Sequence, residues 1–272
     1  MNYRHSFHAG NFADLVKHAL VLWLLERAQR SGPVAVVDTH AGAGLYDLTG
    51  DATRSREAEA GIARLMVAES RPPLIEVLAK AVAALNPDGG ADLYPGSPLL
   101  VARRLRATDG YVGFELNPPV LELLEQALQP FANASAKGGN GYDQAVAEAG
   151  RTPGGLVLID PPFEQPDDYL RAADTGAAIA RADARTTVAI WTPLKDMETF
   201  DGFLRRLDKA GIKGALVAEA RLRPLTNPMK MNGCAMVVLN PPAGAEAAAQ
   251  EICGWVCDAL GNTGARAEVW SS

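Results

Sequence analysis

The chain contains an apolar run that leads directly into a glycine-rich turn, Val34-Ala35-Val36-Val37-Asp38-Thr39-His40-Ala41-Gly42-Ala43-Gly44. Such a run predicts a buried strand, and the turn lies at the carboxyl end of that strand, where an open α/β sheet has its ligand crevice. Glycines there let the backbone approach a ligand, although they also serve plain turns. The dinucleotide pattern GxGxxG is not met because position 47 is Asp, so we expect Gly42 to contact a nucleoside without phosphates.

Apolar strands and helices alternate along most of the chain. Strands are predicted at 34–38, 110–116, 155–160 and 186–192, and helices at 11–30, 118–131, 166–182, 196–210 and 244–260. Continuous apolar strands separated by helices indicate a parallel sheet that is buried on both faces. Two later strands, 214–222 and 234–239, have no helix between them and are expected to pair antiparallel. The predicted fold is α/β, a Rossmann-like and mostly parallel sheet with a C-terminal antiparallel hairpin.

The length of 272 residues suits one enlarged α/β domain, so we predict a single domain over residues 1–272. Residues 46–94 interrupt the alternation. They contain helical patterns at 56–69 and 73–86 and no convincing strand. We therefore expect a helical insertion subdomain at 46–94, after the loop that follows the first strand.

The composition indicates a soluble globular protein, with 26 Lys+Arg, 32 Asp+Glu and 48% hydrophobic residues. A membrane span needs about 20 apolar residues, and no such run occurs. The run at 19–25 superficially resembles a signal-peptide core, but Glu26, Arg27 and Arg30 place charges where small cleavage-site residues belong. We therefore expect a cytoplasmic protein with an amphipathic helix here. The cysteines, Cys234, Cys253 and Cys257, form no CxxC pair and are expected to be buried thiols.

The net charge of −6 excludes a large basic face for nucleic acid, but a local basic patch remains compatible with it. Basic and titratable residues cluster at two places: Arg4, His5, His8, Lys17 and His18, and again Arg221, Arg223 and Lys230. These clusters are either phosphate contacts or ordinary solvated charge. All four histidines fall within the first 40 residues, without a matching Cys or carboxylate cluster, so we expect no metal site. We expect an N-terminal segment folded over the crevice, with imidazoles that donate hydrogen bonds to substrate or cofactor.

Glu115 ends the second predicted strand, in Val112-Gly113-Phe114-Glu115-Leu116. A carboxylate there can accept hydrogen bonds from both ribose hydroxyls of a nucleoside. The usual separation from the first strand is about 20 residues, whereas Glu115 lies 77 positions after Asp38, an excess that the insertion explains. Alone, Glu115 would read as a surface acid; together with the glycine turn it predicts a nucleoside site.

Asp160-Pro161-Pro162-Phe163 ends the most apolar strand of the chain. The two prolines restrict the backbone and turn a carboxylate and a carbonyl towards the crevice. The Asp160 carboxylate and the Pro161 carbonyl can accept the two hydrogens of an exocyclic amine, which aims the nitrogen lone pair at an electrophile. Phe163 would stack on the base, which must leave its helix or come from a single strand. No strong general base is needed, because a methylated amine is cationic and very acidic.

Several segments together resemble the bacterial 23S rRNA (adenine-N6)-methyltransferase family RlmJ. They are Asn2-Tyr3-Arg4-His5-Ser6-Phe7-His8-Ala9-Gly10-Asn11, Ala13-Asp14, Lys17-His18, Asp38-Thr39-His40-Ala41-Gly42-Ala43-Gly44, Gly61-Ile62-Ala63-Arg64, Tyr94-Pro95-Gly96-Ser97-Pro98 and Ile159-Asp160-Pro161-Pro162. The resemblance runs nearly the full length. The N-terminal motif is highly specific, whereas many S-adenosylmethionine-dependent amino-methyltransferases share the glycine turn and the DPP[FY] motif.

The resemblance implies a class I methyltransferase that uses S-adenosylmethionine to methylate N6 of an adenine in 23S rRNA. It places His18, His40, Ser97 and Glu115 at the cofactor, Asp160 at the target amine, and the N-terminal motif at the substrate adenosine: Tyr3, Arg4, His5, His8, Asn11 and Lys17. The family's usual Asp-Gly near the cofactor adenine corresponds to Asn140-Gly141, and Phe163 replaces the commoner Tyr, which keeps the stacking face and loses a hydroxyl. We expect a monomer that binds RNA and no metal.

Three alternatives remain. The DPPF motif alone does not choose the base, so guanine N2 or a DNA adenine could be the methyl acceptor. A non-catalytic S-adenosylmethionine- or nucleotide-binding module is a second reading. A nicotinamide-dependent oxidoreductase is a third, although it lacks the third glycine and gives the DPPF turn no role.

Overall fold

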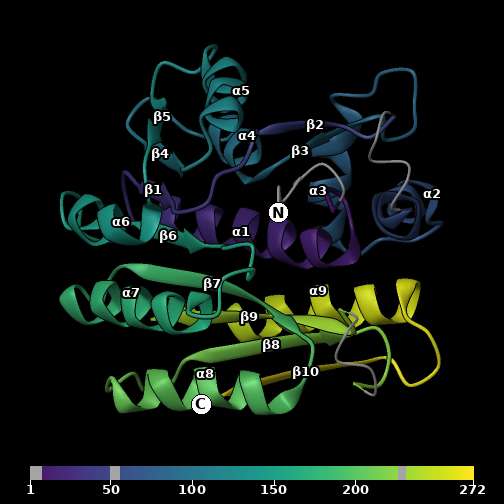
Figure 1. Ribbon diagram of the computed structural model, residues 1–272. Helices are drawn as coiled ribbons and strands as arrows, with labels where there is room; N and C mark the ends of the chain where they lie inside the picture. Colours follow the sequence, from purple (N-terminus) through teal and green to yellow (C-terminus); the bar gives the residue numbers. More distant parts are fainter. Residues whose placement is uncertain (1–7, 50–55, 226–230) are drawn as a thin grey trace.

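The computed structural model describes residues 8–49, 56–225 and 231–272, so the predicted substrate residues Tyr3, Arg4 and His5 lie outside the described residues. An eight-stranded sheet forms the centre of the described chain, in the order β10-β8-β9-β7-β6-β1-β4-β5 (Figure 1). Its strands are β1(Ala35–Asp38), β4(Gly110–Glu115), β5(Ala134–Gly138), β6(Leu156–Ile159), β7(Thr187–Leu194), β8(Leu216–Arg221), β9(Gly233–Leu239) and β10(Arg266–Ser271).

The predicted mixture of parallel and antiparallel pairing is confirmed. β1 pairs parallel with both β4 and β6, β5 extends the sheet beyond β4, and β7 extends it beyond β6. β9 then runs antiparallel to β7 and to β8, which makes the C-terminal hairpin, and β10 adds an antiparallel edge strand. The fold is therefore the predicted Rossmann-like α/β architecture.

Helices cover both faces of this sheet. They are α1(Phe12–Arg30), α2(Arg64–Val67), α3(Pro73–Ala83), α4(Ser97–Ala102), α5(Pro118–Leu128), α6(Gly141–Ala149), α7(Asp168–Ala182), α8(Met197–Lys209) and α9(Ala245–Leu260). Side chains from α1, α4, α5 and α9 share one core with one face of the sheet, whereas α6, α7 and α8 pack on the other face (Figure 1). Val36 points to the first core and Val37 to the second, as the alternation of a strand requires.

Helix α1 is buried on almost every side, which corrects the expectation of an amphipathic helix. Asn11 caps its N-terminus, with Oδ1 accepting from Ala13 N at 2.9 Å and Asp14 N at 3.0 Å. Apolar side chains all round the helix are buried, because the sheet and α9 cover one side and α3 covers another. The polar residues Lys17 and His18 on this helix are therefore also buried, which is decisive for the site.

The segment between β1 and β4 contains strands that the sequence analysis did not expect. β2(Leu45–Asp47) and β3(Leu93–Pro95) pair antiparallel as a small separate sheet, so the prediction of no strand around 46–94 was wrong at both ends. Between them lie α2, α3 and a π-helical turn, η3(Glu59–Ala63). These strands are only three residues long, too short to produce a readable alternation.

The η3 turn docks against the N-terminal segment through two glycines. Ile62 N donates to Gly10 O at 2.8 Å, and a Cβ at Gly61 would lie 2.2 Å from that same oxygen. Gly10 has φ +76°, the left-handed region that favours glycine. The segment before α1 is therefore held from the side by the predicted insertion.

The topology places the loops after β1, β4 and β6 at one edge of the sheet. The chain passes from β1 to β4 and β5 on one side, then returns to β6 on the other side of β1, so β1 and β6 flank a topological switch point. Ligand crevices of open α/β sheets lie at such points. Thr39 N donates to Leu158 O at 3.0 Å, which ties the start of the β1 loop to strand β6.

Candidate active site

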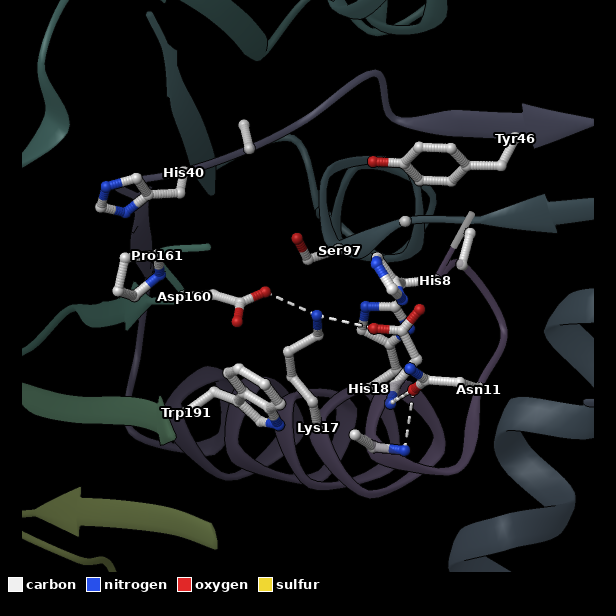
Figure 2. A pocket seen from close by; sticks show the side chains of 15 residues that line it. His8, Asn11, Lys17, His18, His40, Tyr46, Ser97, Asp160, Pro161 and Trp191 are labelled. Carbon is white, nitrogen blue, oxygen red and sulfur yellow. Dashed lines mark hydrogen bonds and ion pairs between the residues drawn. The ribbon is translucent and has the colours of Figure 1, made fainter. Parts of the chain in front are cut away.

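A buried ion-pair chain lies beside the loop after β6. The Lys17 ammonium nitrogen is 2.5 Å from Asp160 Oδ2 and 2.7 Å from Asp14 Oδ1. All three side chains are largely buried, with exposed fractions of 11% for Lys17, 12% for Asp160 and 16% for Asp14. Figure 2 shows Lys17 extending from α1 towards Asp160, with Trp191 beside it.

The protonation states of Asp14, Lys17 and Asp160 follow from their surroundings. Burial raises the pKa of Asp14, but Lys17 and His18 oppose this effect and hold the pKa at about 2, so Asp14 is ionised. Burial likewise lowers the pKa of Lys17, and its two carboxylate partners raise it well above the ordinary value. At Asp160 burial wins over Lys17, and the pKa of this carboxyl is raised. Lys17 therefore helps to keep a desolvated Asp160 ionised.

Asp160 and Lys17 border a small cavity of about 60 Å³. Its lining includes several of the predicted site residues: His8, Asn11, Lys17, His18, His40, Ser97, Asp160 and Pro161 (Figure 2). These residues come from the N-terminal segment, α1, the β1 loop, the start of α4 and the β6 loop. The structure thus brings together sequence motifs that are up to about 150 positions apart.

Asp38, at the end of β1, is a buried carboxylate to which the sequence analysis gave no role. Ser97 Oγ donates to its Oδ2 at 2.7 Å, and the Tyr111 hydroxyl donates to the same oxygen at 3.2 Å. Burial raises the pKa of Asp38 to about 6, against the effect of the hydrogen bond from Ser97. A carboxylate that ends an apolar strand beside a glycine turn was the available signal.

His18 and His40 differ in their surroundings. His18 is buried, and its Nδ1 lies 2.7 Å from the Tyr94 hydroxyl. Burial lowers the pKa of His18 to about 3, so its ring is neutral. His40 lines both the small cavity and a second, middle cavity, and its ring meets that of Tyr142 edge-on with centroids 4.6 Å apart.

The middle cavity has a volume of about 270 Å³ and contains the predicted ribose carboxylate. Glu115 accepts from Gly42 N at 3.1 Å through Oε2 and from Asn117 N at 2.8 Å through Oε1. The glycine turn and the end of β4 therefore hold one another. Phe114, Leu116, Val120 and Tyr142 supply apolar walls, and Arg171 lies over the Tyr142 ring at 4.5 Å.

Asn140 and Gly141 also line the middle cavity. Asn140 caps α6, because its Oδ1 accepts from Tyr142 N at 3.1 Å. Its amide nitrogen is not used in that bond. At Gly141 a Cβ would lie 1.9 Å from Thr39 O, so only glycine permits this approach of α6 to the β1 loop. A carboxylate at the end of β4, apolar walls and amide groups suit an adenosine, so these residues fit the nucleoside end of S-adenosylmethionine.

A large cavity of about 670 Å³ borders the small one. His8, Asn11 and Trp191 line both this cavity and the small one. Phe163 lines the large cavity; it is 8% exposed and packs against Tyr169 and Trp191, with ring centroids 4.5 and 5.8 Å away. Phe163 has φ +51°, which is uncommon for a bulky residue and marks a sharp turn after the prolines.

Glu57 was missed by the sequence analysis and holds the start of the N-terminal motif. It accepts from Asn11 Nδ2 at 2.9 Å, and His8 Nδ1 lies 3.0 Å from each of its carboxylate oxygens. This contact raises the pKa of His8. An isolated Glu in a helical pattern is ordinary surface composition, so the sequence offered no signal for it.

Metal-binding clusters and membrane-spanning helices are both absent from the described ranges. No group of three or more His, Cys, Asp or Glu in these ranges is arranged to hold a metal ion. Each helix there is too short or too polar to span a lipid bilayer.

A family model, two curated relatives and a solved structure each match most of the chain. A family model described as "Ribosomal RNA large subunit methyltransferase D, RlmJ" matches residues 31–272. The ribosomal RNA large subunit methyltransferase J of Escherichia coli is 32% identical over 259 residues, which cover 94% of this chain and 92% of that protein. The protein of the same name from Haemophilus influenzae is 35% identical over 260 residues, with 93% and 91% covered. A crystal structure from Legionella pneumophila has the same fold, with a TM-score of 0.88, 24% identity and 97% and 98% coverage.

Proposed function

Because this chain belongs to the RlmJ family of ribosomal RNA large subunit methyltransferases, we propose that it transfers a methyl group from S-adenosylmethionine to N6 of a specific adenine in 23S rRNA. The observation that carries the proposal is that Asp160 lines a small cavity that borders two larger ones. The small cavity shares His40 with the middle cavity, and His8 and Trp191 with the large one. A donor in the middle cavity and an acceptor in the large cavity can therefore both approach Asp160.

In this proposal the middle cavity holds the adenosine of the cofactor. Glu115 would accept from the ribose hydroxyls, and Gly42, Asn140 and Gly141 would border the nucleoside. His18, His40 and Ser97, in the small cavity, would hold the methionine end. The bound cofactor supplies a sulfonium methyl that is already activated, so the protein has mainly to align donor and acceptor. Such alignment is worth up to roughly 7–11 kcal/mol of the barrier.

The target amine would lie at the Asp160–Pro161 corner. Lys17 occupies Oδ2 of Asp160, which leaves Oδ1 as the acceptor for one amine hydrogen while the Pro161 carbonyl accepts the other. This arrangement aims the nitrogen lone pair away from both oxygens. After transfer the methylated nitrogen is cationic and very acidic, and its proton passes to Asp160 or to water.

The target base would enter through the large cavity, which Phe163 and Trp191 both line. Stacking on aromatic rings is worth about 1–3 kcal/mol per base and suits an unpaired nucleotide. His8 of the N-terminal segment lines this cavity, as do Glu57, Ala60 and Arg64 of the predicted insertion. We assign RNA contacts to the insertion at 46–94 and to the N-terminal motif with Tyr3, Arg4, His5, His8, Asn11 and Lys17. We further propose that the protein acts in the cytoplasm, because its substrate is ribosomal RNA. We also propose that it acts as a monomer.

The decisive experiment combines Asp160→Ala with a transcribed 23S rRNA fragment and labelled S-adenosylmethionine. We expect wild-type protein to produce N6-methyladenosine, and the variant to bind S-adenosylhomocysteine normally while methyl transfer is nearly abolished. Recovery of N2-methylguanosine, or modification of DNA alone, would replace the assigned acceptor. A binding module would show no transfer in either protein.

Calorimetric titration distinguishes the proposed methyltransferase from the remaining alternative, a nicotinamide-dependent oxidoreductase. S-adenosylhomocysteine should bind, and NAD should not, because the β1 loop lacks the third glycine of the dinucleotide pattern. Tight binding of NAD with no binding of S-adenosylhomocysteine would reverse the assignment to an oxidoreductase.

A further inference from the structure

The large cavity extends beyond the place where a target base would meet Asp160. Its volume of about 670 Å³ exceeds that of the other two cavities together. Trp191 also lines the small cavity that contains Asp160. The lining of the large cavity includes apolar and basic residues that the proposed reaction does not use: Pro193, Lys195, Leu222, Arg223 and Met231. The proposed function thus leaves this part of the cavity without an occupant.

Lys195 and Arg223 reach the cavity from two strands that end at the same level. β7 and β8 both run antiparallel to β9 and are therefore parallel to one another. Their last residues, Leu194 and Arg221, are each paired with Gly233. Lys195 and Arg223 lie just beyond these strand ends, on either side of the start of β9, at the edge of the sheet that also carries Asp160.

Neither cation is committed to a partner in the part of the chain that the structure describes. Lys195 is exposed and has no hydrogen bond or ion pair there. The Nε of Arg223 is buried and has no hydrogen-bond partner among the described residues. A buried donor without a partner is unfavourable and indicates an acceptor that is supplied from outside.

The other charged residues of the large cavity, Arg64, Glu57 and Glu164, differ from Lys195 and Arg223. Arg64, the third cation of this cavity, donates to the carbonyl oxygens of Ala259 and Leu260 at the end of α9. Of the two carboxylates, Glu57 is held by His8 and Asn11, and Glu164 is exposed. Two cations without partners among the described residues therefore remain beside an apolar floor, which suits a phosphate attached to a base.

We propose that Lys195 and Arg223 bind the backbone phosphate next to the target adenine, and that the neighbouring base lies on Pro193, Leu222 and Met231. This inference rests on the proposed function, because it requires an RNA strand that enters the large cavity. Arg223 contributes a planar guanidinium that matches phosphate oxygens, and Lys195 contributes a mobile point charge. The RNA then crosses the carboxyl ends of β7 and β8 as a single strand.

The test measures RNA affinity and methyl transfer in the variant Lys195→Ala/Arg223→Ala. We expect the Kd and KM for a single-stranded 23S rRNA fragment to rise at least about tenfold at about 0.1 M salt, with kcat at saturating RNA unchanged within about twofold. The slope of log Kd against log salt should become shallower by about 0.7 for one phosphate that is no longer neutralised. S-adenosylhomocysteine affinity should stay at the wild-type value.

The matched control is Arg205→Ala/Lys209→Ala. It also removes one Arg and one Lys, both exposed on α8 and outside the cavity lining. An RNA affinity and salt slope in Lys195→Ala/Arg223→Ala equal to those of the control would overturn the proposal, as would a loss confined to the cofactor. If the double variant fails to fold, Lys195→Glu decides, because this exposed substitution should weaken RNA binding more than Lys195→Gln, and equal binding by the two would overturn the proposal. A wild-type protein without methyl transfer would instead refute the proposed function.

Discussion

Lys17 Nζ and Asp160 Oδ2 lie 2.5 Å apart although 143 positions separate them in the chain. Lys17 belongs to the buried helix α1, and Asp160 begins the loop after β6. The ion pair therefore joins the catalytic candidate to the hydrophobic core. It also fixes one carboxylate oxygen and leaves the other for the substrate.

Lys17→Met should shift the dependence of kcat on pH, so that the fall in kcat on the acid side (the acid limb) occurs at higher pH. Lys17 opposes the rise in the pKa of Asp160 that burial causes, so its removal lets that pKa rise further. Asp160 must be ionised to accept from the amine, so at a pH below the limb the rate should fall about tenfold for every pH unit by which the limb moves. Loss of one partner from a buried pair also costs about 3–5 kcal/mol of folding free energy, measurable by denaturant titration.

The control for this change is Lys213→Met, which breaks an exposed pair with Asp208 and should leave both the profile and the stability nearly unchanged. An unshifted acid limb in Lys17→Met would show that the ammonium does not control Asp160.

Asp14→Asn should remove a pH-dependent part of the stability. The pKa of Asp14 is lowered to about 2, so its ionised form stabilises the folded state above its unfolded value near 3.8, and this contribution disappears as pH falls through 2. The free energy of unfolding should thus differ between wild type and variant by about 2 kcal/mol at about pH 6, and by much less near pH 2. Asp174→Asn, at an exposed pair with Arg206, should differ by under about 1 kcal/mol. A difference independent of pH would contradict the assignment.

Glu115→Gln should weaken S-adenosylhomocysteine binding by about 10- to 100-fold, because a charged hydrogen bond is worth about 1.5–3 kcal/mol. The amide oxygen can still accept from Gly42 N, so the glycine turn should keep its shape and the melting temperature should change little. Calorimetry measures the affinity, and Glu125→Gln, exposed on α5, provides the comparison. Equal affinity in both variants would remove Glu115 from the cofactor site.

Gly141→Ala should destabilise the protein by about 1–3 kcal/mol or more, since its Cβ would lie 1.9 Å from Thr39 O. Displacement of α6 from the β1 loop should also weaken cofactor binding. Gly254→Ala is the matched control, because nothing lies within 4 Å of its Cβ in the interior of α9. That substitution should stabilise the helix by about 0.5–1 kcal/mol. Denaturant titration compares the two, and the same sign in both would refute the steric argument.

Tyr3→Ala should reduce methylation of RNA more than cofactor affinity, as expected for a residue of the N-terminal substrate motif. The two readouts are the initial rate on the rRNA fragment and the Kd for S-adenosylhomocysteine. Equal losses in both would place Tyr3 at the cofactor or in the core.

The main sheet could be predicted from the sequence because most of its strands are apolar and separated by helices. β6 is buried at every residue, and so are β8 and β9. Two edge strands gave no such pattern. β5 reads Ala-Ser-Ala-Lys-Gly, which has little β-forming tendency, and β10 is half-exposed against a single neighbour. These segments are strands because they pair with β4 and β8, and the sequence does not reveal that pairing.

The site was partly predictable for a geometric reason. Residues that end parallel strands share one edge, so His40, Glu115 and Asp160 could be grouped from the order of strands and helices alone. Partners that come from outside the sheet could not. The resemblance to the RlmJ family, now confirmed, named Lys17 but did not identify it as the partner of Asp160. Asp14 belonged to a segment of that resemblance without an assigned role, and Glu57 carried no pattern. Such contacts depend on how α1 and η3 dock, which is a tertiary property.

The packing of α1 against α9 has a consequence for biosynthesis. Both helices contribute to one core, and the guanidinium of Arg27 donates to Ala243 O at 2.9 Å, just before α9 begins. A nascent chain makes α1 roughly 200 residues before α9, so the side of α1 that α9 covers stays exposed during that interval. Lys17 can pair with Asp160 earlier, once β6 and the loop after it have been made.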